Sequence, residues 1–278
     1  MTYNDIWRRL AKVYPDNEAK AISRLLMEDL FGLSLSDIIC GAADRLSDDS
    51  CRVLEEAVQR LERSEPIQYV TGKALFCDRL FHVEPGVLIP RPETEQLCRL
   101  VVEGIKDVSH PYILDIGTGS GCIATTLSLD IPEARLSAWD VSDKALSIAA
   151  ANAEALGARV RFSKQDALNA PDDKARWDAI VSNPPYICDR EKADMERNVL
   201  DNEPHLALFV PDSAPLLFYR SISEYAAKSL RDGGLLFFEI NEHYANDTSM
   251  MLQRLGFDDI RIIKDIFDKD RNIVCRKR

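Results

Sequence analysis

The chain lacks the cysteine and histidine spacing on which disulfide frameworks and structural metal sites depend. Its seven cysteines are odd in number, scattered and never in C-x-x-C spacing, and its four histidines lie far apart. This pattern argues against a disulfide-stapled secreted fold and against a zinc site, and it indicates a reducing compartment. We therefore expect no metal ion.

Long apolar runs and excess positive charge are also missing. No stretch reaches the roughly 18 apolar residues that identify a membrane-spanning helix, and the first residues, MTYNDIWRRL, do not resemble a signal peptide. The net charge is −11, and neither residues 1–85 nor the remainder is basic. A broad phosphate-binding surface would carry excess positive charge. We expect a cytoplasmic protein with no membrane segment and no direct contact with nucleic acid.

The sequence divides into three regions. Residues 1–65 repeat apolar positions at helical spacing, which predicts a small helical bundle that we interpret as a substrate-docking domain. Residues 66–92 are rich in β-formers and turn residues, so we expect a β-hairpin or extended linker. Residues 93–278 alternate helices and strands, which predicts an α/β domain with a mostly parallel sheet and helices on both faces.

Within 93–278 the expected helices are 94–106, a helix ending at 129 after a glycine-rich turn, 142–156, 215–230 and 244–255. The expected strands are 112–116, 135–139, 160–164, 178–181 and 235–240, with 260–266 and 272–276 as an antiparallel pair. A Gly-Gly turn is expected at 233–234, and a long loop after the fourth strand.

The glycine-rich turn DIGTGSG (115–121) follows the first strand and opens a helix. Glycines there let the backbone approach a ligand and present N–H groups at a helix N-terminus. The dinucleotide fingerprint G-x-G-x-x-G fails, because Cys122 stands at the third glycine position. The spacing instead resembles motif I of S-adenosylmethionine-dependent methyltransferases, with a simple tight turn as the alternative. The candidate cofactor residues in it are Asp115, Gly117, Thr118, Gly119, Ser120 and Gly121.

Carboxylates also end the next two strands. Asp140 has the geometry to accept both hydroxyls of a ribose, although it could instead cap the following helix. Asp166 is placed to receive an adenine amino group, with backbone contacts from Ala167, although a solvated strand end is nearly as good an interpretation. Since ligands of open α/β sheets bind outside the carboxyl ends of the strands, these residues and the glycine-rich turn predict one site.

The fourth strand runs into Asn183-Pro184-Pro185-Tyr186. Two successive prolines fix φ, remove backbone donors and hold the preceding residue extended. The Asn183 side chain and the Pro184 carbonyl then become fixed hydrogen-bond acceptors beside the ring of Tyr186. Such a cluster suits a planar NH2 group, either a glutamine amide or the exocyclic amine of adenine. A turn that merely ends the strand is the structural alternative.

Several stretches together resemble the HemK/PrmC family, the protein-(glutamine-N5) methyltransferases of peptide-chain release factors. They are PIQYVTG (66–72), LIPRPETE (88–95), ILDIGTGSG (113–121), IVSNPPYI (180–187) and Glu203-Pro204. The resemblance implies a Rossmann-like class I fold with a seven-stranded sheet, S-adenosylmethionine as cofactor, S-adenosylhomocysteine as product, and the Gly-Gly-Gln loop of a release factor as substrate. We expect a monomer.

The same resemblance gives the residues roles. Asn183, Pro184 and Tyr186 would be catalytic, Asn183 would also border the cofactor, and Pro185 would complete the substrate site. Arg91 and Glu203 would contact the substrate. The alternative for Arg91 is a structural ion pair or helix cap, and the alternative for Glu203 is a solvent-exposed loop.

Three segments depart from the family pattern, at 76–78, 212–215 and 239–242. A glutamine methyltransferase of a ribosomal protein, an adenine-N6 DNA methyltransferase and an inactive binding module remain as alternatives.

Overall fold

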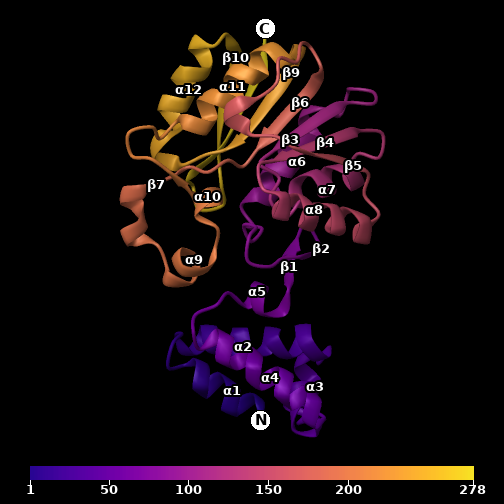
Figure 1. Cartoon of the computed structure of the whole chain (residues 1–278), viewed down its shortest axis with the longest axis vertical. Coiled ribbons are helices and arrows are strands. Elements are labelled where there is room, and N and C mark those ends of the chain that lie inside the picture. The colour runs from indigo at the N-terminus through magenta and orange to yellow at the C-terminus, as the bar shows by residue number, and fades with distance from the viewer. The chain divides into compact units, whose positions relative to one another are not determined.

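The chain folds into two compact units. The computed structural model describes residues 1–278, apart from the side chain at position 194, and Figure 1 shows its helices and strands. The first unit comprises Met1–Lys73, Val83–Pro85 and Glu196–Asn202, and the second comprises Ala74–His82, Gly86–Met195 and Glu203–Arg278. The domain boundaries expected at 65/66 and 92/93 stay predictions.

The first unit is helical, with a core supplied by the apolar faces of its helices. Ile6, Leu26 and Leu54, from three different helices, pack in one buried cluster, as the helical spacing of the sequence predicts. Thr2 caps the first helix in a reciprocal capping box with Asp5. The helices are α1 (Tyr3–Leu10), α2 (Asp16–Phe31), α3 (Leu35–Ile39), α4 (Asp48–Leu61), α5 (Ile67–Thr71) and α9 (Arg197–Asn202), with the 3-10 turn η1 (Ala42–Arg45).

The linker region contains a short helix in addition to the predicted hairpin. Helix α5 begins after Pro66 and ends at Gly72, whose φ is 72°. A proline fits the start of a helix and a left-handed glycine its end, so the two residues bracket one helical turn. The predicted hairpin is present as β1 (Lys73–Phe76) and β2 (Arg79–His82). Its turn residues Cys77 and Asp78 both have positive φ, as a two-residue type I′ turn requires.

The second unit is built on a seven-stranded sheet in the order β10-β11-β9-β6-β3-β4-β5. The pairs from β9 through β5 are parallel, whereas β11 runs antiparallel to both β9 and β10. The predicted mostly parallel seven-stranded sheet is therefore confirmed. The strands are β3 (Tyr112–Ile116), β4 (Arg135–Asp140), β5 (Val160–Lys164), β6 (Trp177–Ser182), β9 (Leu230–Glu239), β10 (Phe257–Lys264) and β11 (Asp270–Lys277).

Helices cover both faces of this sheet (Figure 1). Successive side chains of a strand point to opposite faces, so Leu114 of β3 packs in a cluster with Tyr219 of α11, whereas Ile113 packs with Leu97 of α6. Both faces are thus buried, as a doubly wound parallel sheet requires. The helices are α6 (Thr94–Gly104), α7 (Cys122–Asp130), α8 (Asp143–Leu156), α11 (Leu217–Ser229) and α12 (Ala245–Arg254).

The expected turn at 233–234 is absorbed into strand β9, which begins at Leu230. Pairing with β6 passes from Trp177–Leu230 to Ala179–Leu235, so extra residues of β9 bulge out opposite a single residue of β6. The expected strand 235–240 was therefore too short at its start. Glycines suit a bulge as well as a turn, and the sequence pattern does not separate the two.

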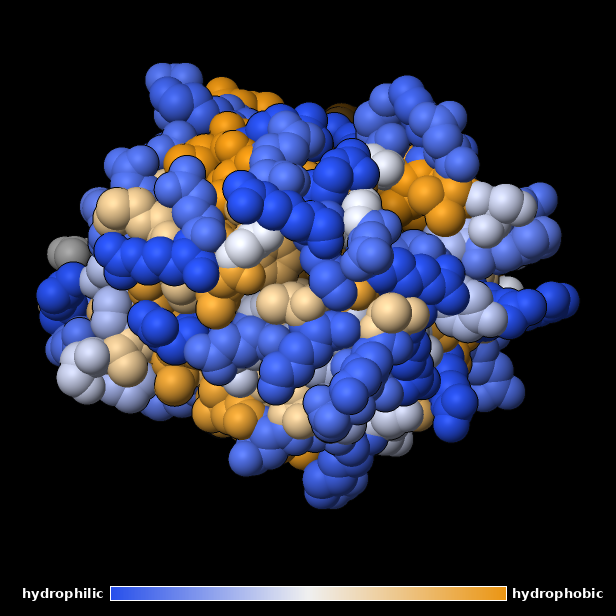
Figure 2. Space-filling view, turned by 90° about the horizontal axis from the view of Figure 1, so that it is seen from above, coloured by the Kyte–Doolittle hydropathy of each residue, from blue (hydrophilic) through white to orange (hydrophobic). Residues whose placement is uncertain are grey.

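The long loop after β6 carries short elements. Strands β7 (Ile187–Cys188) and β8 (Phe209–Val210) pair in parallel, and η3 (Asp189–Asp194) and α10 (His205–Leu208) lie between them; η2 (Ala167–Asn169) and η4 (Glu242–Tyr244) follow β5 and β9. Within the described residues, every helix is too short or too polar to cross a membrane. The face drawn in Figure 2 is mainly hydrophilic, with hydrophobic side chains in scattered patches.

Candidate active site

The carboxyl ends of four parallel strands bring the predicted cofactor residues and the segment 183–186 to one edge of the sheet. Strands β3, β4, β5 and β6 end at Ile116, Asp140, Lys164 and Ser182. The strand order reverses between β3 and β6, since the chain runs from β3 outward to β5 and returns to the other side of β3. This switch point is where open α/β sheets bind their ligands.

The glycine-rich turn leaves open space beside two of its three glycines. Gly117 and Gly119 have φ of 76° and 55°, and a Cβ on either would meet nothing within 4 Å. Gly121 differs, because a Cβ there would lie 2.8 Å from the Cβ of Ala149 in α8. The first two glycines therefore leave room for a ligand against the backbone, whereas the third is required for close packing of α7 on α8.

Asp115 supports the turn from within the protein. The residue has no exposed surface, and its Oδ2 accepts a hydrogen bond of 2.6 Å from the hydroxyl of Thr118. Its Oδ1 is buried without a hydrogen-bond partner among the described residues. Burial raises the pKa of Asp115 to about 7, opposed by the Thr118 hydrogen bond. Ser120, also predicted to bind cofactor, is buried, and its carbonyl accepts from Asn152 of α8.

Asp140 links the end of β4 to the glycine-rich turn. Its Oδ2 accepts from the backbone N–H of Gly119 at 2.9 Å, and its Oδ1 accepts from the N–H of Ser142 at 2.9 Å. The side-chain cap of α8 is supplied by Ser142, which accepts from the N–H of Ala145. Each carboxylate oxygen keeps a lone pair beyond these bonds, so Asp140 retains acceptor capacity for a ribose.

The side chain of Asp166 accepts hydrogen bonds from residues of its own loop. Its Oδ1 accepts from the N–H of Leu168 at 2.8 Å and its Oδ2 from the side chain of Asn169 at 2.7 Å. The carbonyl of Ala167 accepts from the hydroxyl of Ser221. These bonds place the carboxylate at the start of η2 in an N-cap geometry. The predicted adenine contacts of Asp166 and Ala167 stay predictions.

The segment 183–186 is anchored by hydrogen bonds on both sides. Asn183 Nδ2 donates to Thr94 Oγ1 at 3.2 Å, and the hydroxyl of Tyr186 donates to Glu239 Oε1 at 3.1 Å. The carbonyl of Tyr186 accepts from the side chain of Asn241. Among the described residues, no hydrogen bond reaches Asn183 Oδ1 or the carbonyl of Pro184. Both predicted acceptors are therefore available to a substrate NH2 group, and Pro185 holds the backbone between them and the ring.

The network includes two buried residues that the sequence motifs do not identify. Thr94 begins α6 and is 3% exposed, and Glu239 ends β9 and is 2% exposed. The Thr94 hydroxyl donates to Glu239 Oε2 at 2.6 Å. Burial raises the pKa of Glu239, opposed by the Thr94 hydrogen bond and the charge of Arg271. The sequence does carry a signal for Glu239, because this residue, like Asp140, is a carboxylate at the carboxyl end of a strand. The family resemblance marks the segment 239–242 only as a departure from the family pattern.

Tyr186 is partly exposed as a side chain, whereas its hydroxyl is enclosed. Burial, and then the charge of Glu239, raise the pKa of Tyr186 well above its usual value. The phenol therefore stays protonated and acts as a donor to the carboxylate.

Arg91 and Glu203 form an ion pair that joins two distant segments. Arg91 Nη2 contacts Glu203 Oε1, and Glu203 Oε2 accepts from the N–H of Ile89. The Glu203 side chain is 1% exposed, so the interpretation as a solvent-exposed loop residue is wrong. The Arg91 side chain is 33% exposed, so part of it is accessible to solvent. Substrate contact by either residue stays a prediction.

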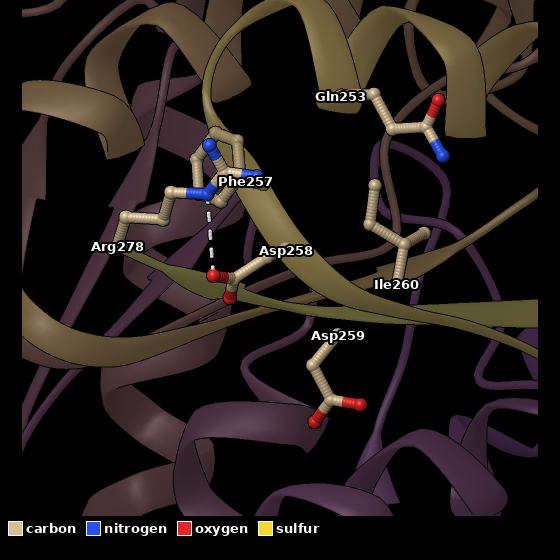
Figure 3. A pocket seen from close by; sticks show the side chains of 6 residues that line it. All are labelled: Gln253, Phe257, Asp258, Asp259, Ile260 and Arg278. Carbon is tan, nitrogen blue, oxygen red and sulfur yellow. Dashed lines mark hydrogen bonds and ion pairs between the residues drawn. The ribbon is translucent and has the colours of Figure 1, made fainter.

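A cavity of about 400 Å3 lies elsewhere in the second unit. Figure 3 shows its lining at the start of β10 and the chain end, with Arg278 paired to Asp258. Asp258 of β10 pairs with Arg276 of β11, and Arg276 pairs in turn with Leu235 of β9. Leu235 is the first residue of β9 that pairs with β11, so it lies toward the amino end of that strand. The cavity is therefore at the opposite edge of the sheet from the candidate site. No group of three or more potential metal ligands occurs within the described part of the chain.

Known proteins resemble the chain along nearly its whole length. A release factor glutamine methyltransferase of Bacteroides thetaiotaomicron is 48% identical over 273 residues, which cover 98% of each chain. The chain belongs to the release factor glutamine methyltransferase family. Other members include those of Flavobacterium psychrophilum, 38% identical over 95% of this chain and 94% of the relative, and Chlorobaculum tepidum, 37% identical over 93% and 90%.

Two family models match separate parts of this release factor glutamine methyltransferase family member. The methyltransferase small domain matches residues 80–205 and the PrmC N-terminal domain matches residues 4–72. The fold is the Rossmann-like class I methyltransferase fold, and the cofactor is S-adenosylmethionine. The residues present fit this cofactor, because Gly117 and Gly119 leave a cradle that any Cβ would fill and Asp140 keeps acceptor capacity beside it.

Proposed function

We propose that the chain methylates the side-chain amide nitrogen, N5, of the glutamine in the Gly-Gly-Gln segment of peptide-chain release factors. The observation that carries this proposal is the 48% identity to a release factor glutamine methyltransferase over 98% of both chains. The site supports it chemically, because Asn183 Oδ1 and the carbonyl of Pro184 have no hydrogen-bond partner among the described residues.

In this proposal Asn183 Oδ1 and the carbonyl of Pro184 accept the two N–H groups of the substrate amide. Amide nitrogen is a weak nucleophile because its lone pair is delocalised. Two fixed acceptors orient that nitrogen and stabilise the positive charge that develops on it, at no reorganisation cost during reaction. Tyr186 packs against the planar amide. After transfer the cationic N-methyl amide loses one proton to water, so no strong base is needed.

The loops after β3, β4 and β5 would bind the cofactor. When bound, S-adenosylmethionine would supply the methyl group, with S-adenosylhomocysteine as the product. Asp140 would accept the ribose hydroxyls, Asp166 and Ala167 would contact the adenine, and the turn from Asp115 to Gly121 would carry the remainder. Arg91 and Glu203 would border the entering substrate loop, with Glu203 holding the guanidinium in place.

We further infer a cytoplasmic monomer that needs neither nucleic acid nor a membrane. The net charge of −11 supports the first exclusion, and the class of substrate supports the compartment. Size-exclusion chromatography with light scattering checks the monomer, for which a mass near twice 31.3 kDa would be the contrary result.

The direct test offers three acceptors separately with radiolabelled S-adenosylmethionine: a release factor, ribosomal proteins and adenine-rich DNA. We expect label in the release factor alone, and none when its Gly-Gly-Gln glutamine is replaced. Label in DNA or in a ribosomal protein would select one of the alternative substrates. No label in any acceptor would indicate an inactive binding module.

Replacing the central acceptor tests the residue roles. Asn183→Ala should lower the rate of methyl transfer on the order of 100-fold or more, the scale measured for one group that stabilises transition-state charge. Cofactor affinity, measured by calorimetry, should change little. Asn246→Ala, at an exposed position in α12, is the matched control and should behave as the wild type. Equal loss of transfer and of cofactor affinity in Asn183→Ala would contradict the role.

A further inference from the structure

Four side chains of the second unit form one continuous hydrogen-bonded chain. Asn183 Nδ2 donates to Thr94 Oγ1 at 3.2 Å, and Thr94 Oγ1 donates to Glu239 Oε2 at 2.6 Å. The other carboxylate oxygen of Glu239 accepts from the hydroxyl of Tyr186 at 3.1 Å. One buried carboxylate is thus connected to both ends of the segment 183–186. This series of hydrogen bonds joins α6, β9 and the loop after β6, which are far apart in sequence.

The direction of each hydrogen bond follows from the chemistry of the groups. An ionised carboxylate only accepts, and a threonine hydroxyl has a single proton to donate. The proton of Thr94 is committed to Glu239, so Thr94 Oγ1 meets Asn183 as an acceptor. Only the NH2 end of the Asn183 amide can satisfy that acceptor. Thr94 and Glu239 are nearly inaccessible to solvent, so water does not compete for these positions.

This direction has a consequence for the substrate. With Nδ2 held by Thr94, Asn183 Oδ1 is left at the opposite end of the amide, free to accept. If the amide were turned by 180°, its NH2 group would face the NH2 group of the substrate, and two donors would meet. An isolated asparagine has no strong preference between these orientations, since its two ends are nearly the same size.

We propose that Thr94 and Glu239 are positioning residues that hold the Asn183 amide with Oδ1 toward the substrate nitrogen. The proposal rests on the proposed function of the site, but the orientation that it assigns is a property of the protein without substrate. Burial raises the pKa of Glu239, opposed by the Thr94 hydrogen bond, the charge of Arg271 and the Tyr186 hydrogen bond. The geometry carries the assignment, because Glu239 Oε2 accepts from Thr94 and Glu239 Oε1 accepts from Tyr186.

Three substitutions separate this role from a general structural one. Thr94→Val keeps the shape but removes the hydroxyl, Thr94→Ser keeps the hydroxyl, and Glu239→Gln keeps the shape but adds a donor. The glutamine cannot accept from both Thr94 and Tyr186, because one end of its amide is NH2. Thr94→Val and Glu239→Gln should therefore release or reverse the Asn183 amide, and Thr94→Ser should preserve it.

The kinetic experiment measures methylation of the release factor. We expect kcat to fall on the order of tenfold or more in Thr94→Val and Glu239→Gln, the scale of one mispaired buried hydrogen bond. Cofactor affinity should stay near wild type and Tm should fall by only a few degrees, the effect of losing one buried hydrogen bond. Thr94→Ser should recover the rate to within about threefold. In an Asn183→Ala background, Thr94→Val should have no further effect, because Thr94 acts through Asn183. Parallel loss of rate, cofactor affinity and Tm, or a wild-type rate in Thr94→Val, would overturn the proposal.

A second measurement needs no substrate. The side-chain NH2 signal of Asn183, identified by its loss in Asn183→Ala, should show one exchange-protected proton by NMR in the wild type and in Thr94→Ser. Protection should disappear in Thr94→Val. Unchanged protection in Thr94→Val would overturn the proposal even if methylation were altered. If the wild type methylates no release factor, the proposed function fails while this signal still decides the orientation of Asn183.

Discussion

Asp115 is a carboxylate without exposed surface at the end of β3. Its pKa is raised from 3.8 to about 7 by burial. Between these two values the folded state binds more protons than the unfolded state, so raising the pH lowers the free energy of unfolding. The destabilisation is absent below about pH 4 and complete above about pH 7, and each unit of pKa shift corresponds to about 1.4 kcal/mol.

Asp115→Asn should remove this dependence while its side-chain oxygen still accepts from Thr118. The free energy of unfolding of the variant, relative to wild type, should increase by a few kcal/mol between about pH 4 and pH 8. Urea unfolding of both proteins across this range measures the difference and cancels contributions from other groups, including Glu239. Parallel pH curves for the two proteins would contradict the assignment.

Single residues also show what sequence alone could supply. Asp140 and Asn183 were predicted because strand ends and the Asn-Pro-Pro-Tyr motif are local patterns. The partnership of Thr94 with Glu239 was not, because these residues lie 145 positions apart and meet only after the sheet has formed. For the same reason the burial of Glu203 against Arg91 was not decided in advance.

Among the elements, helices α7 and α8 depend on one glycine for their contact. Gly121 and Gly157 have nearly the same backbone, with φ of 79° and 74°. An alanine at Gly157, the C-cap of α8, would meet nothing within 4 Å, whereas one at Gly121 would meet Ala149 at 2.8 Å. Comparing alanine substitutions at these two glycines therefore separates the cost of backbone strain from the cost of overpacking.

Gly157→Ala should destabilise the protein by about 1–2 kcal/mol, the cost of a left-handed residue with a Cβ. Gly121→Ala should lose about 1–3 kcal/mol more because of overpacking. Urea unfolding measures both, and Ala149→Gly combined with Gly121→Ala should recover part of the additional loss. Equal losses at the two glycines would show that α8 moves aside without cost.

The seven strands of the main sheet and the helices that cover it followed from the sequence to within a few residues at most boundaries, because alternating and helical periodicity report buried faces directly. The short elements of the loop after β6 did not. The start of β9 was predicted too late, since a Gly-Gly pair indicates a bulge as readily as a turn. Helix α5 was missed because a single helical turn carries too few apolar positions to show a period. Its signals were Pro66 and Gly72, which also suit an extended linker.

For the whole molecule, charge is the property that the sequence fixes most directly. With a net charge of −11, repulsion from phosphate should dominate encounters with nucleic acid. Fluorescence anisotropy with a labelled adenine-rich oligonucleotide should show no saturable binding at about 0.15 M salt, where the Debye length is ~8 Å. Saturable binding that weakens steeply with salt would reveal a local basic patch and favour the DNA alternative.

The first unit is assembled from separate stretches of the chain. The backbone passes between the two units five times, after Lys73, His82, Pro85, Met195 and Asn202. A genetic crossover exchanges one contiguous piece of sequence, so a single event near position 73 would transfer most of the helical bundle and leave α9 behind. The helical unit is therefore poorly suited to shuffling as a cassette between enzymes, and its history should be tied to that of the catalytic unit.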